Sequence, residues 1–287
     1  MALSSGRKRG RALSRLATAA IAAALVGTTA GTASAAPTAA VPSFPLMAAK
    51  SSGELYEYQP NGLGGFGDRK LVDNEWTDVT ATMQTDQDQN GSADHAYLRL
   101  SDGSLGFADT TDQAGESDAV YVGGGWNIYD RLLSPGNLGG TKEPDVLARD
   151  KSGVLWIYQG RPDGTLSDRY RVGPGWDMFT DMAGRGDLNG DGKTDIVAKD
   201  KAGVLWFYKG TGNYQSPFEG RVKVGSGWNI FNTLVSSGDV NGDGRSDMLA
   251  RDTAGVLWLY KGNGNATDPF ESRVRIGGGW GQYNNFF

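Results

Sequence analysis

Short acidic loops contain the residues best suited to chemistry. The pattern D-x-[DN]-x-[DN]-G-x-x-D occurs three times, beginning at Asp86, Asp187 and Asp239. Positions 1, 3, 5 and 9 can turn side-chain oxygens inward, position 7 offers its main-chain carbonyl, and the glycine permits a sharp turn. Because Ca²⁺ takes about six to eight oxygen ligands, each loop is a predicted calcium site. The predicted ligands are Asp86, Asp88, Asn90, Ser92 and Asp94; Asp187, Asn189, Asp191, Lys193 and Asp195; and Asp239, Asn241, Asp243, Arg245 and Asp247.

A fourth loop of the same length departs from this pattern. It runs from Asn137 to Asp145, with Gly139 and Thr141 at positions 3 and 5 and Lys142 in place of the turn glycine. We therefore expect no metal there and about three calcium ions in all. A solvated hairpin of Asx turns without an ion is the alternative, but recurrence of all five ligand positions in three loops argues against it. We expect the ions to be structural, since an ion that binds only the native state stabilises it.

The tryptophans reveal an internal repeat. Five of the eight are spaced by 50, 50, 52 and 52 residues, at positions 76, 126, 176, 228 and 280. The other three, Trp156, Trp206 and Trp258, share one position of a second recurring series, GVLW. Each unit of roughly 50 residues holds four short β signals separated by turn residues, which is typical of a propeller blade.

The two ends of the chain complete each other. The second to fourth β signals occur five times, starting with residues 45–53, whereas the first occurs four times in full. The C-terminal residues 283–287 align with residues 231–235, the beginning of a first strand. The sequence thus predicts an all-β fold, a five-bladed β-propeller of four-stranded blades. The C-terminal strand 1 pairs with N-terminal strands 2–4 to close the ring, which removes a free edge.

These loops resemble the FG-GAP/VCBS repeat family over about residues 45–287. The resemblance rests on segments such as GDLNGDGKTD followed by IVAKD. It implies Ca²⁺ binding in the loops and a propeller fold, although the family usually forms larger rings. The G-W-[ND]-x-F/Y segments are also similar to the five-bladed tachylectin-type lectin repeat. That second resemblance implies binding of N-acetylated sugars at repeated sites around the ring.

The five regularly spaced tryptophans each end a predicted fourth strand. They could be packing wedges between blades, or platforms on which a sugar ring stacks, because an indole face suits the apolar face of a pyranose. A polar residue follows three of them and could bond to hydroxyl or acetamide groups. The candidate ligand-binding residues are Trp76, Trp126, Asn127, Trp176, Asp177, Trp228, Asn229 and Trp280.

Other recurring side chains have simpler interpretations. We expect the GVLW tryptophans to be core residues and His95 to be an ordinary strand residue. A basic residue followed by aspartate recurs in the second strand, at Arg149-Asp150, Lys199-Asp200 and Arg251-Asp252. This favours an ion pair within the blade, and a contact with a polar ligand is the alternative. A non-repeated acidic segment contains Asp112, Glu116 and Asp118 and is interpreted as solvated.

The N-terminus has the pattern of a secretory signal peptide. Five basic residues lie between Arg7 and Arg15, an alanine-rich apolar stretch follows, and Ala33-Ser34-Ala35 fits a cleavage site after Ala35. The stretch is too short to span a membrane well. We expect residues 1–35 to be removed, residues 36–44 to form a flexible lead-in and residues 45–287 to form one domain, secreted and extracellular. Cleavage leaves 23 of the 28 basic side chains against 33 acidic ones, a net charge of −10.

Composition excludes several functional classes. Without cysteine the chain can have no disulfide scaffold, zinc cluster or thiol nucleophile, and an acidic balance argues against a nucleic-acid partner. Three functions stay open. The first is a multivalent carbohydrate-binding module for N-acetylated sugars or cell-wall glycans. The second is a docking module for a secreted protein, and the third is a polysaccharide-degrading enzyme. Because the acidic residues recur with the repeat, whereas a catalytic pair should break it, we expect a non-enzymatic monomer.

Overall fold

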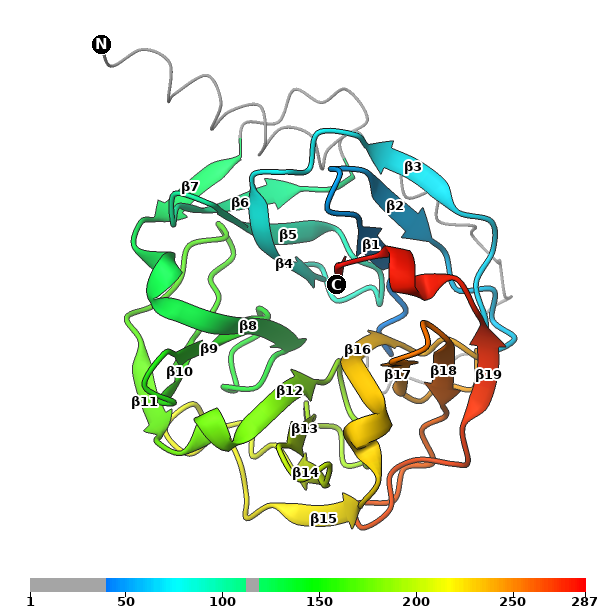
Figure 1. The fold of residues 1–287 in the computed structure, drawn as a ribbon. Coiled ribbons are helices and arrows are strands. Elements are labelled where there is room, and N and C mark those ends of the chain that lie inside the picture. The colour runs from blue at the N-terminus through cyan, green and yellow to red at the C-terminus, as the bar shows by residue number, and fades with distance from the viewer. Residues whose placement is uncertain (1–39, 112–118) are drawn as a thin grey trace, which may run out of the picture.

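The fold is a ring of β-sheets. The computed structural model describes residues 40–111 and 119–287. Within these residues, twenty strands form five antiparallel four-stranded sheets around a central axis (Figure 1). The predicted five-bladed propeller is confirmed. The predicted signal peptide and the acidic segment at Asp112, Glu116 and Asp118 lie outside the described residues.

Each blade starts with its innermost strand. Blade 1 contains β20 (Asn285–Phe286), β1 (Leu46–Ala49), β2 (Leu55–Tyr58) and β3 (Lys70–Asp73). Blade 2 contains β4 (Val79–Thr85), β5 (His95–Leu100), β6 (Leu105–Asp109) and β7 (Val120–Gly123). Blade 3 contains β8 (Tyr129–Gly136), β9 (Asp145–Asp150), β10 (Leu155–Tyr158) and β11 (Tyr170–Gly173). Blade 4 contains β12 (Phe179–Ala183), β13 (Ile196–Asp200), β14 (Leu205–Tyr208) and β15 (Val222–Gly225). Blade 5 contains β16 (Phe231–Gly238), β17 (Asp247–Asp252), β18 (Leu257–Tyr260) and β19 (Val274–Gly277).

Blade 1 joins the two ends of the chain. In the pairing of β20 with β1, Phe286 lies opposite Ala48. The main chains of Met47 and Phe287 also exchange two hydrogen bonds, of 2.9 and 3.1 Å. The Phe287 ring is buried and stacks on Trp76 with ring centroids 6.2 Å apart. The predicted closure by a C-terminal strand 1 is therefore confirmed.

Glycine shapes the connection from one blade to the next. Gly125, Gly175, Gly227 and Gly279 precede the recurring tryptophan and have φ between 82° and 92°, a conformation that other residues adopt only with strain. A 3₁₀-helix follows each of them: η2 (Trp126–Ile128), η3 (Trp176–Met178), η4 (Trp228–Ile230) and η5 (Trp280–Gln282). The chain turns there from an outermost strand to the next innermost one.

The core consists of layers between neighbouring blades. On the third strand of a blade, buried Leu, Ile or Phe residues alternate with half-buried aromatic residues, so both strand faces are covered. In one layer, Leu155 and Ile157 of blade 3 cluster with Trp176, Phe179 and Ile196. Each blade therefore completes its core only against its neighbours.

The packed domain begins before residue 45. Ser43 N donates to Gly91 O in blade 2, and Phe44 N donates to Ser237 O in blade 5, both at 2.7 Å. Phe44 is 2 % exposed. Residues 40–44 of the predicted flexible lead-in are thus held between two blades. Among the described residues, none of the helical segments has the length and apolar character needed to span a bilayer.

Candidate functional site

The three predicted calcium loops lie on one face of the ring, which we call the loop face. They join the first and second strands of blades 2, 4 and 5, and the connections between third and fourth strands share that face because the sheets are antiparallel. In blade 2, carboxylate oxygens of Asp86, Asp88 and Asp94 lie within 4.8 Å of one another. Burial and the two neighbouring carboxyls raise the pKa of Asp86 to about 6. A divalent cation would relieve this repulsion, so the donor set fits Ca²⁺.

In blades 4 and 5 the first aspartate of the loop is held by its own turn. Asp187 Oδ1 accepts hydrogen bonds from the amides of Asn189 and Gly190, at 3.0 and 2.7 Å. Asp239 Oδ1 accepts from Gly242 N at 2.7 Å, and its Oδ2 accepts from Gly244 N at 2.8 Å. Within the described residues, only the blade 2 loop brings three carboxylates together. The other two predicted ligand sets lie in the corresponding loops of blades 4 and 5.

The last aspartate of the loop has a role that we did not predict. Asp195 and Asp247 are fully buried, and so is Asp145 in the loop for which no metal is expected. Asp145 Oδ2 accepts a hydrogen bond from Leu138 N at 2.8 Å, and its Oδ1 accepts from Gly160 N at 3.2 Å. This carboxylate therefore ties the loop to the end of the third strand, with or without an ion. Its persistence in the degenerate loop was the signal available in the sequence.

Burial has a common effect on these aspartates. It raises the pKa of Asp145 and Asp247 to about 6 and that of Asp195 to about 7, against the lowering effect of the main-chain amides. Because metal binding requires the ionised carboxylate, any Ca²⁺ held by the loops of blades 4 and 5 would bind more tightly as pH rises.

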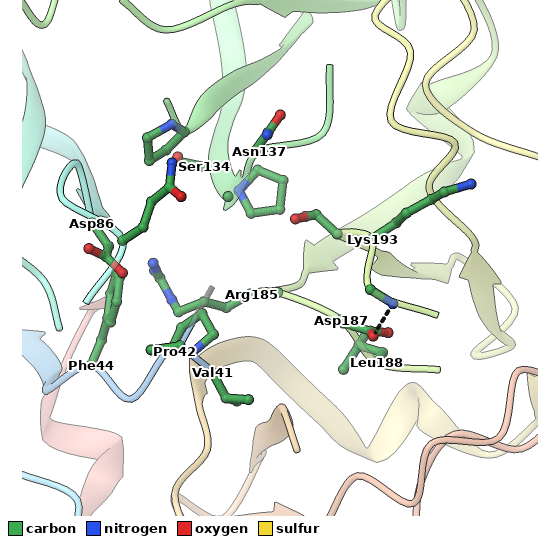
Figure 2. Close-up of a pocket in the computed structure, with 18 of the residues that line it drawn as sticks. Val41, Pro42, Phe44, Asp86, Ser134, Asn137, Arg185, Asp187, Leu188 and Lys193 are labelled. Atoms are coloured by element: carbon green, nitrogen blue, oxygen red, sulfur yellow. Dashed lines mark hydrogen bonds between the residues drawn. The ribbon is translucent and has the colours of Figure 1, made fainter. Parts of the chain in front are cut away.

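The loops surround a pocket of about 600 Å³ at one end of the central channel (Figure 2). It is lined by residues from blades 2, 3, 4 and 5 and by the N-terminal segment 40–44. Labelled lining residues in Figure 2 include Phe44, Asp86, Asn137, Arg185, Asp187 and Lys193. Its size lies within the range of sites for small ligands.

Arg185 lies deep in this pocket and is 7 % exposed. Its Nε donates to Ser236 O at 3.0 Å, and its Nη1 donates to Gln84 O at 3.1 Å. The guanidinium lies 4.0 Å from the centroid of the Phe44 ring. Burial lowers the pKa of Arg185 to about 9, so the side chain keeps its charge at neutral pH. Sequence reasoning missed this residue, although it is the only charged one at its repeat position, nine residues after the recurring tryptophan.

The recurring tryptophans are packing residues. Trp76, Trp126, Trp176, Trp228 and Trp280 are 5–8 % exposed. The rings of Trp126, Trp176 and Trp228 each contact a tyrosine of the following blade, with centroid distances of 4.8, 4.8 and 4.5 Å. Their indole faces are covered, which favours the packing interpretation over the sugar platform. The neighbouring Asn127, Asp177 and Asn229 are exposed, on the face opposite the loop face.

The GVLW tryptophans are half-buried rather than core residues. Trp156 Nε1 donates to Asp150 Oδ2 at 2.9 Å, and Arg169 stacks on its ring at 4.1 Å. The same arrangement recurs at Trp206 with Asp200 and Arg221, and at Trp258 with Asp252 and Arg273.

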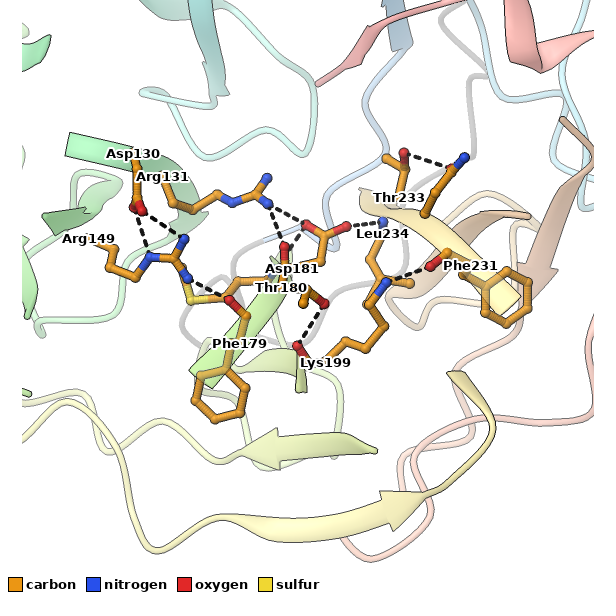
Figure 3. A network of polar contacts seen from close by, with 12 residues as sticks. Asp130, Arg131, Arg149, Phe179, Thr180, Asp181, Lys199, Phe231, Thr233 and Leu234 are labelled. Carbon is orange, nitrogen blue, oxygen red and sulfur yellow. Dashed lines mark hydrogen bonds and ion pairs between the residues drawn. The ribbon is translucent and has the colours of Figure 1, made fainter. Parts of the chain in front are cut away.

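The predicted ion pair within the blade is present at Arg149, although its partner is not the adjacent aspartate. Because neighbouring residues of a strand point to opposite faces, Arg149 cannot reach Asp150. Its Nε instead pairs with Asp130 at 2.8 Å, while its Nη1 bonds to main-chain carbonyls of blade 4 (Figure 3). His95 begins β5 and stacks on Phe107, which confirms that it is a strand residue.

A second polar network links three innermost strands. Asp181 of β12 is buried, and its Oδ1 lies 3.2 Å from Arg131 Nη2 of β8. Its Oδ2 accepts a hydrogen bond of 2.6 Å from Leu234 N of β16 (Figure 3). This group of contacts connects blades 3, 4 and 5 around the channel.

Comparison with solved structures finds 395 similar chains, among them the following three. The BBS1N chain, from a crystal structure of its complex with ARL6DN soaked with mercury, is 13% identical in sequence and has a TM-score of 0.42. The match covers 83% of the present chain and 66% of the BBS1N chain. Human WBSCR16 is 8% identical and has a TM-score of 0.37, and the match covers 81% of the present chain and 65% of WBSCR16. Prp20p from Saccharomyces cerevisiae, described with its binding to Gsp1p and histones, is 12% identical and has a TM-score of 0.39. The match covers 81% of the present chain and 61% of Prp20p. The chain thus spans 61 to 66% of the length of these proteins.

Sequence comparison identifies the repeat itself. No curated protein matches the chain. A profile of the FG-GAP-like repeat family matches residues 187–250. This range starts at the first aspartate of the blade 4 loop and ends in β17, so it contains two of the three acidic loops. The chain is a five-bladed β-propeller that carries an FG-GAP-like repeat, a fold typical of binding modules.

Proposed function

We propose that this protein is a secreted, calcium-stabilised module that binds a glycan on its loop face. The observation that carries the proposal is the pocket of about 600 Å³ at the end of the channel. Its lining offers hydroxyls, amides and charges of both signs, for example Thr85, Asn137 and Lys193, and one aromatic ring, Phe44. A ligand with many hydroxyl groups suits such a surface better than an apolar one.

The location of this pocket changes the valency that the repeat suggested. Five equivalent sites would need open tryptophan faces, but these indoles are buried between blades. The loop-face pocket is instead single and built from different residues of four blades. We therefore expect one glycan per chain, bound in the pocket, with N-acetylated sugars as the first candidates.

Calcium is proposed to hold the rim of this pocket. Asp86 and Asp187 are first ligands of two predicted calcium loops, and both line the pocket. Ions at these loops would fix the rim and stabilise the native state, because they bind a geometry that the unfolded chain lacks. Asp86, Asp88 and Asp94 would hold one ion, and the corresponding loop residues of blades 4 and 5 would hold two others.

A glycan array followed by calorimetric titration of a hit tests the glycan proposal. The mature protein is loaded with Ca²⁺, and the hit is titrated again after chelation with EDTA. Binding with a stoichiometry near one supports the pocket, whereas an array without hits on the calcium form contradicts it. N-terminal sequencing of protein recovered from the medium should find Ala36 first, which tests secretion and cleavage.

Thermal melting with and without EDTA tests the metal. Ca²⁺ should raise the melting temperature, and Asp88→Asn should reduce this gain since it removes a ligand charge. Asn137→Ala provides the matched control, because it changes the loop in which no ion is expected. An equal calcium response of wild type and Asp88→Asn would contradict a site in blade 2.

A protein partner is the second candidate, favoured by the opposite face. Ile128 and Ile230 are 47% and 44% exposed there, beside Asn127 and Asn229. Exposed apolar side chains next to polar ones are common at transient interfaces. A pull-down from culture supernatant with wild type and Ile128→Asp distinguishes this candidate. A stoichiometric partner that is lost in the variant and not displaced by sugars would support it.

A further inference from the structure

The lining of the loop-face pocket is more basic than the protein as a whole. The full chain has a net charge of −5. Of the charged described residues that line the pocket, the basic ones are Lys142, Arg185, Lys193 and Arg245, and the acidic ones are Asp86 and Asp187. Both aspartates accept hydrogen bonds from amides of their own loops. With four basic and two acidic side chains, the lining as a whole is positively charged.

Arg185 supplies the deepest of these charges. Two of its nitrogens donate to main-chain carbonyls, and Nη2 has no acceptor among residues 40–111 and 119–287. No described carboxylate lies within ion-pair distance of its guanidinium, whereas Arg149 and Arg131 pair with Asp130 and Asp181. Figure 2 shows the side chain extending across the pocket between Asp86 and Pro42. Asp86 favours the charged guanidinium from beyond ion-pair distance. Burying a cation is still costly, and an anion that binds the guanidinium directly would offset that cost further.

The repeat shows that packing does not require this arginine. The equivalent residues of blades 2, 3 and 5 are Thr85, Pro135 and Ser237, which are small and uncharged. Arg185 therefore breaks the symmetry of the ring at one position, and that position lies in the pocket. In a repeat protein such a departure marks the place where the function differs from the scaffold.

The remaining basic side chains lie at the mouth of the pocket. Lys142, Lys193 and Arg245 are all exposed and come from the loops of blades 3, 4 and 5. They would attract an anion toward the buried guanidinium, whose planar N–H groups match a carboxylate or a phosphate.

We propose that the pocket recognises a sugar bearing an anionic group, a carboxylate or a phosphate, and that Arg185 binds this group. The inference rests on the proposed glycan-binding function and narrows it from sugars in general to acidic ones. The neutral part of the ligand would contact the hydroxyl and amide lining, while the guanidinium determines specificity.

Calorimetric titration of the mature protein with three probes tests this assignment. The probes are digalacturonate, galactose 1-phosphate and neutral galactobiose. An acidic probe should bind at least about tenfold more tightly than galactobiose, a difference of about 1.4 kcal/mol. The tighter of the two acidic probes identifies the anion as carboxylate or phosphate. Sodium chloride should weaken acidic binding and leave galactobiose unaffected.

Variants locate the effect at one residue. Arg185→Gln should bring acidic probes to the affinity of galactobiose, and Arg185→Lys should retain part of the preference. Arg171→Gln, on the exposed outer strand β11, changes the charge equally and should have no effect. If Arg185→Gln melts at a lower temperature than wild type, the double variant Lys142→Gln/Arg245→Gln, which changes two exposed residues, is titrated instead. Loss of the preference for acidic probes in this variant also supports a cationic pocket.

Two results would overturn the inference, and they are distinguishable from failure of the proposed function. Equal binding of digalacturonate, galactose 1-phosphate and galactobiose by wild type is one. Unchanged acidic binding by the folded Arg185→Gln variant is the other. A glycan array with neutral hits only rejects the anionic ligand and leaves glycan binding intact, whereas an array with no hits rejects both.

Discussion

Arg149 of β9 donates a hydrogen bond of 2.6 Å from Nη1 to the carbonyl of Phe179, the first residue of the innermost strand of the next blade. The same nitrogen donates to Trp176 O at 3.0 Å. Arg99 and Arg251 make the equivalent bonds to the following blade. Lys199 makes one such bond, to Phe231 O at 2.6 Å. At four of the five blade boundaries a cation of one blade is thus joined to a main-chain carbonyl of the next, whereas blade 1 has Ala49 at this position.

Removing this donor should weaken the ring. Arg149→Met should lower the free energy of unfolding by about 2–4 kcal/mol, because two carbonyls lose a charged donor. Arg149→Lys should cost less, since blade 4 makes the same link with Lys199. Urea denaturation measures both, with Arg171→Met on an exposed strand as the control. Equal losses for the Met and Lys variants would contradict a role for the charged hydrogen bond.

Ring closure should depend on the last residues of the chain. Deleting residues 281–287 removes β20 together with the buried Tyr283 and Phe287, and leaves β1 as an unpaired edge. We expect the truncated protein to lose cooperative thermal unfolding in calorimetry. Gln282→Ala changes an exposed residue of the same segment and should melt like wild type. A cooperative transition at the wild-type temperature after truncation would show that the closure is dispensable.

The buried tryptophans should affect stability rather than ligand selection. Trp176 is 7% exposed and contacts Phe179, Tyr208 and Phe218. Trp176→Ala should therefore destabilise the fold by about 3–5 kcal/mol. Asp177→Ala, at the exposed neighbour, should change stability little. Thermal melts measure the effect on stability. Titration with the sugar found on the array, carried out well below the melting temperature, measures the effect on binding. A Trp176→Ala protein that is as stable as wild type but no longer binds the sugar would support the stacking-platform interpretation instead.

Asp145 should make stability depend on pH. Burial raises its pKa from 3.8 to about 6 in the native state. Between these two values the native state binds more protons at Asp145 than the unfolded state does. The contribution of Asp145 to the free energy of unfolding therefore falls as pH rises and is level above about pH 6. The full effect is at most about 3 kcal/mol.

Chemical denaturation between pH 4 and pH 7 in the presence of a chelator measures this slope. Asp145→Asn should make it shallower, because the variant has no proton to lose at this position, whereas Asp86, Asp195 and Asp247 keep their contributions. Asp268→Asn, which removes an exposed carboxyl, should keep the wild-type slope. An unchanged slope in Asp145→Asn would show that another group determines the pH dependence.

The repeat and its closure could be predicted from the sequence. Strand alternation and turn glycines are local properties, and the spacing of Trp76 to Trp280 repeats them five times. The alignment of residues 283–287 with 231–235 then required the two ends to share a blade. The acidic loops were also recognisable, because a calcium loop is built from residues close together in the chain.

Only the tertiary structure determined the partners and exposure of individual side chains. Trp126 and Trp156 both recur with the repeat, but the first is covered by the next blade and the second by Arg169. The sequence did not identify the partners of Arg149, because Asp130 lies on the neighbouring strand and the carbonyl acceptors come from another repeat. Arg185 became significant once the ring brought Phe44, Gln84 and Ser236 around it. Local pattern specified the blades, whereas contacts across blade boundaries, between residues far apart in the chain, formed the pocket.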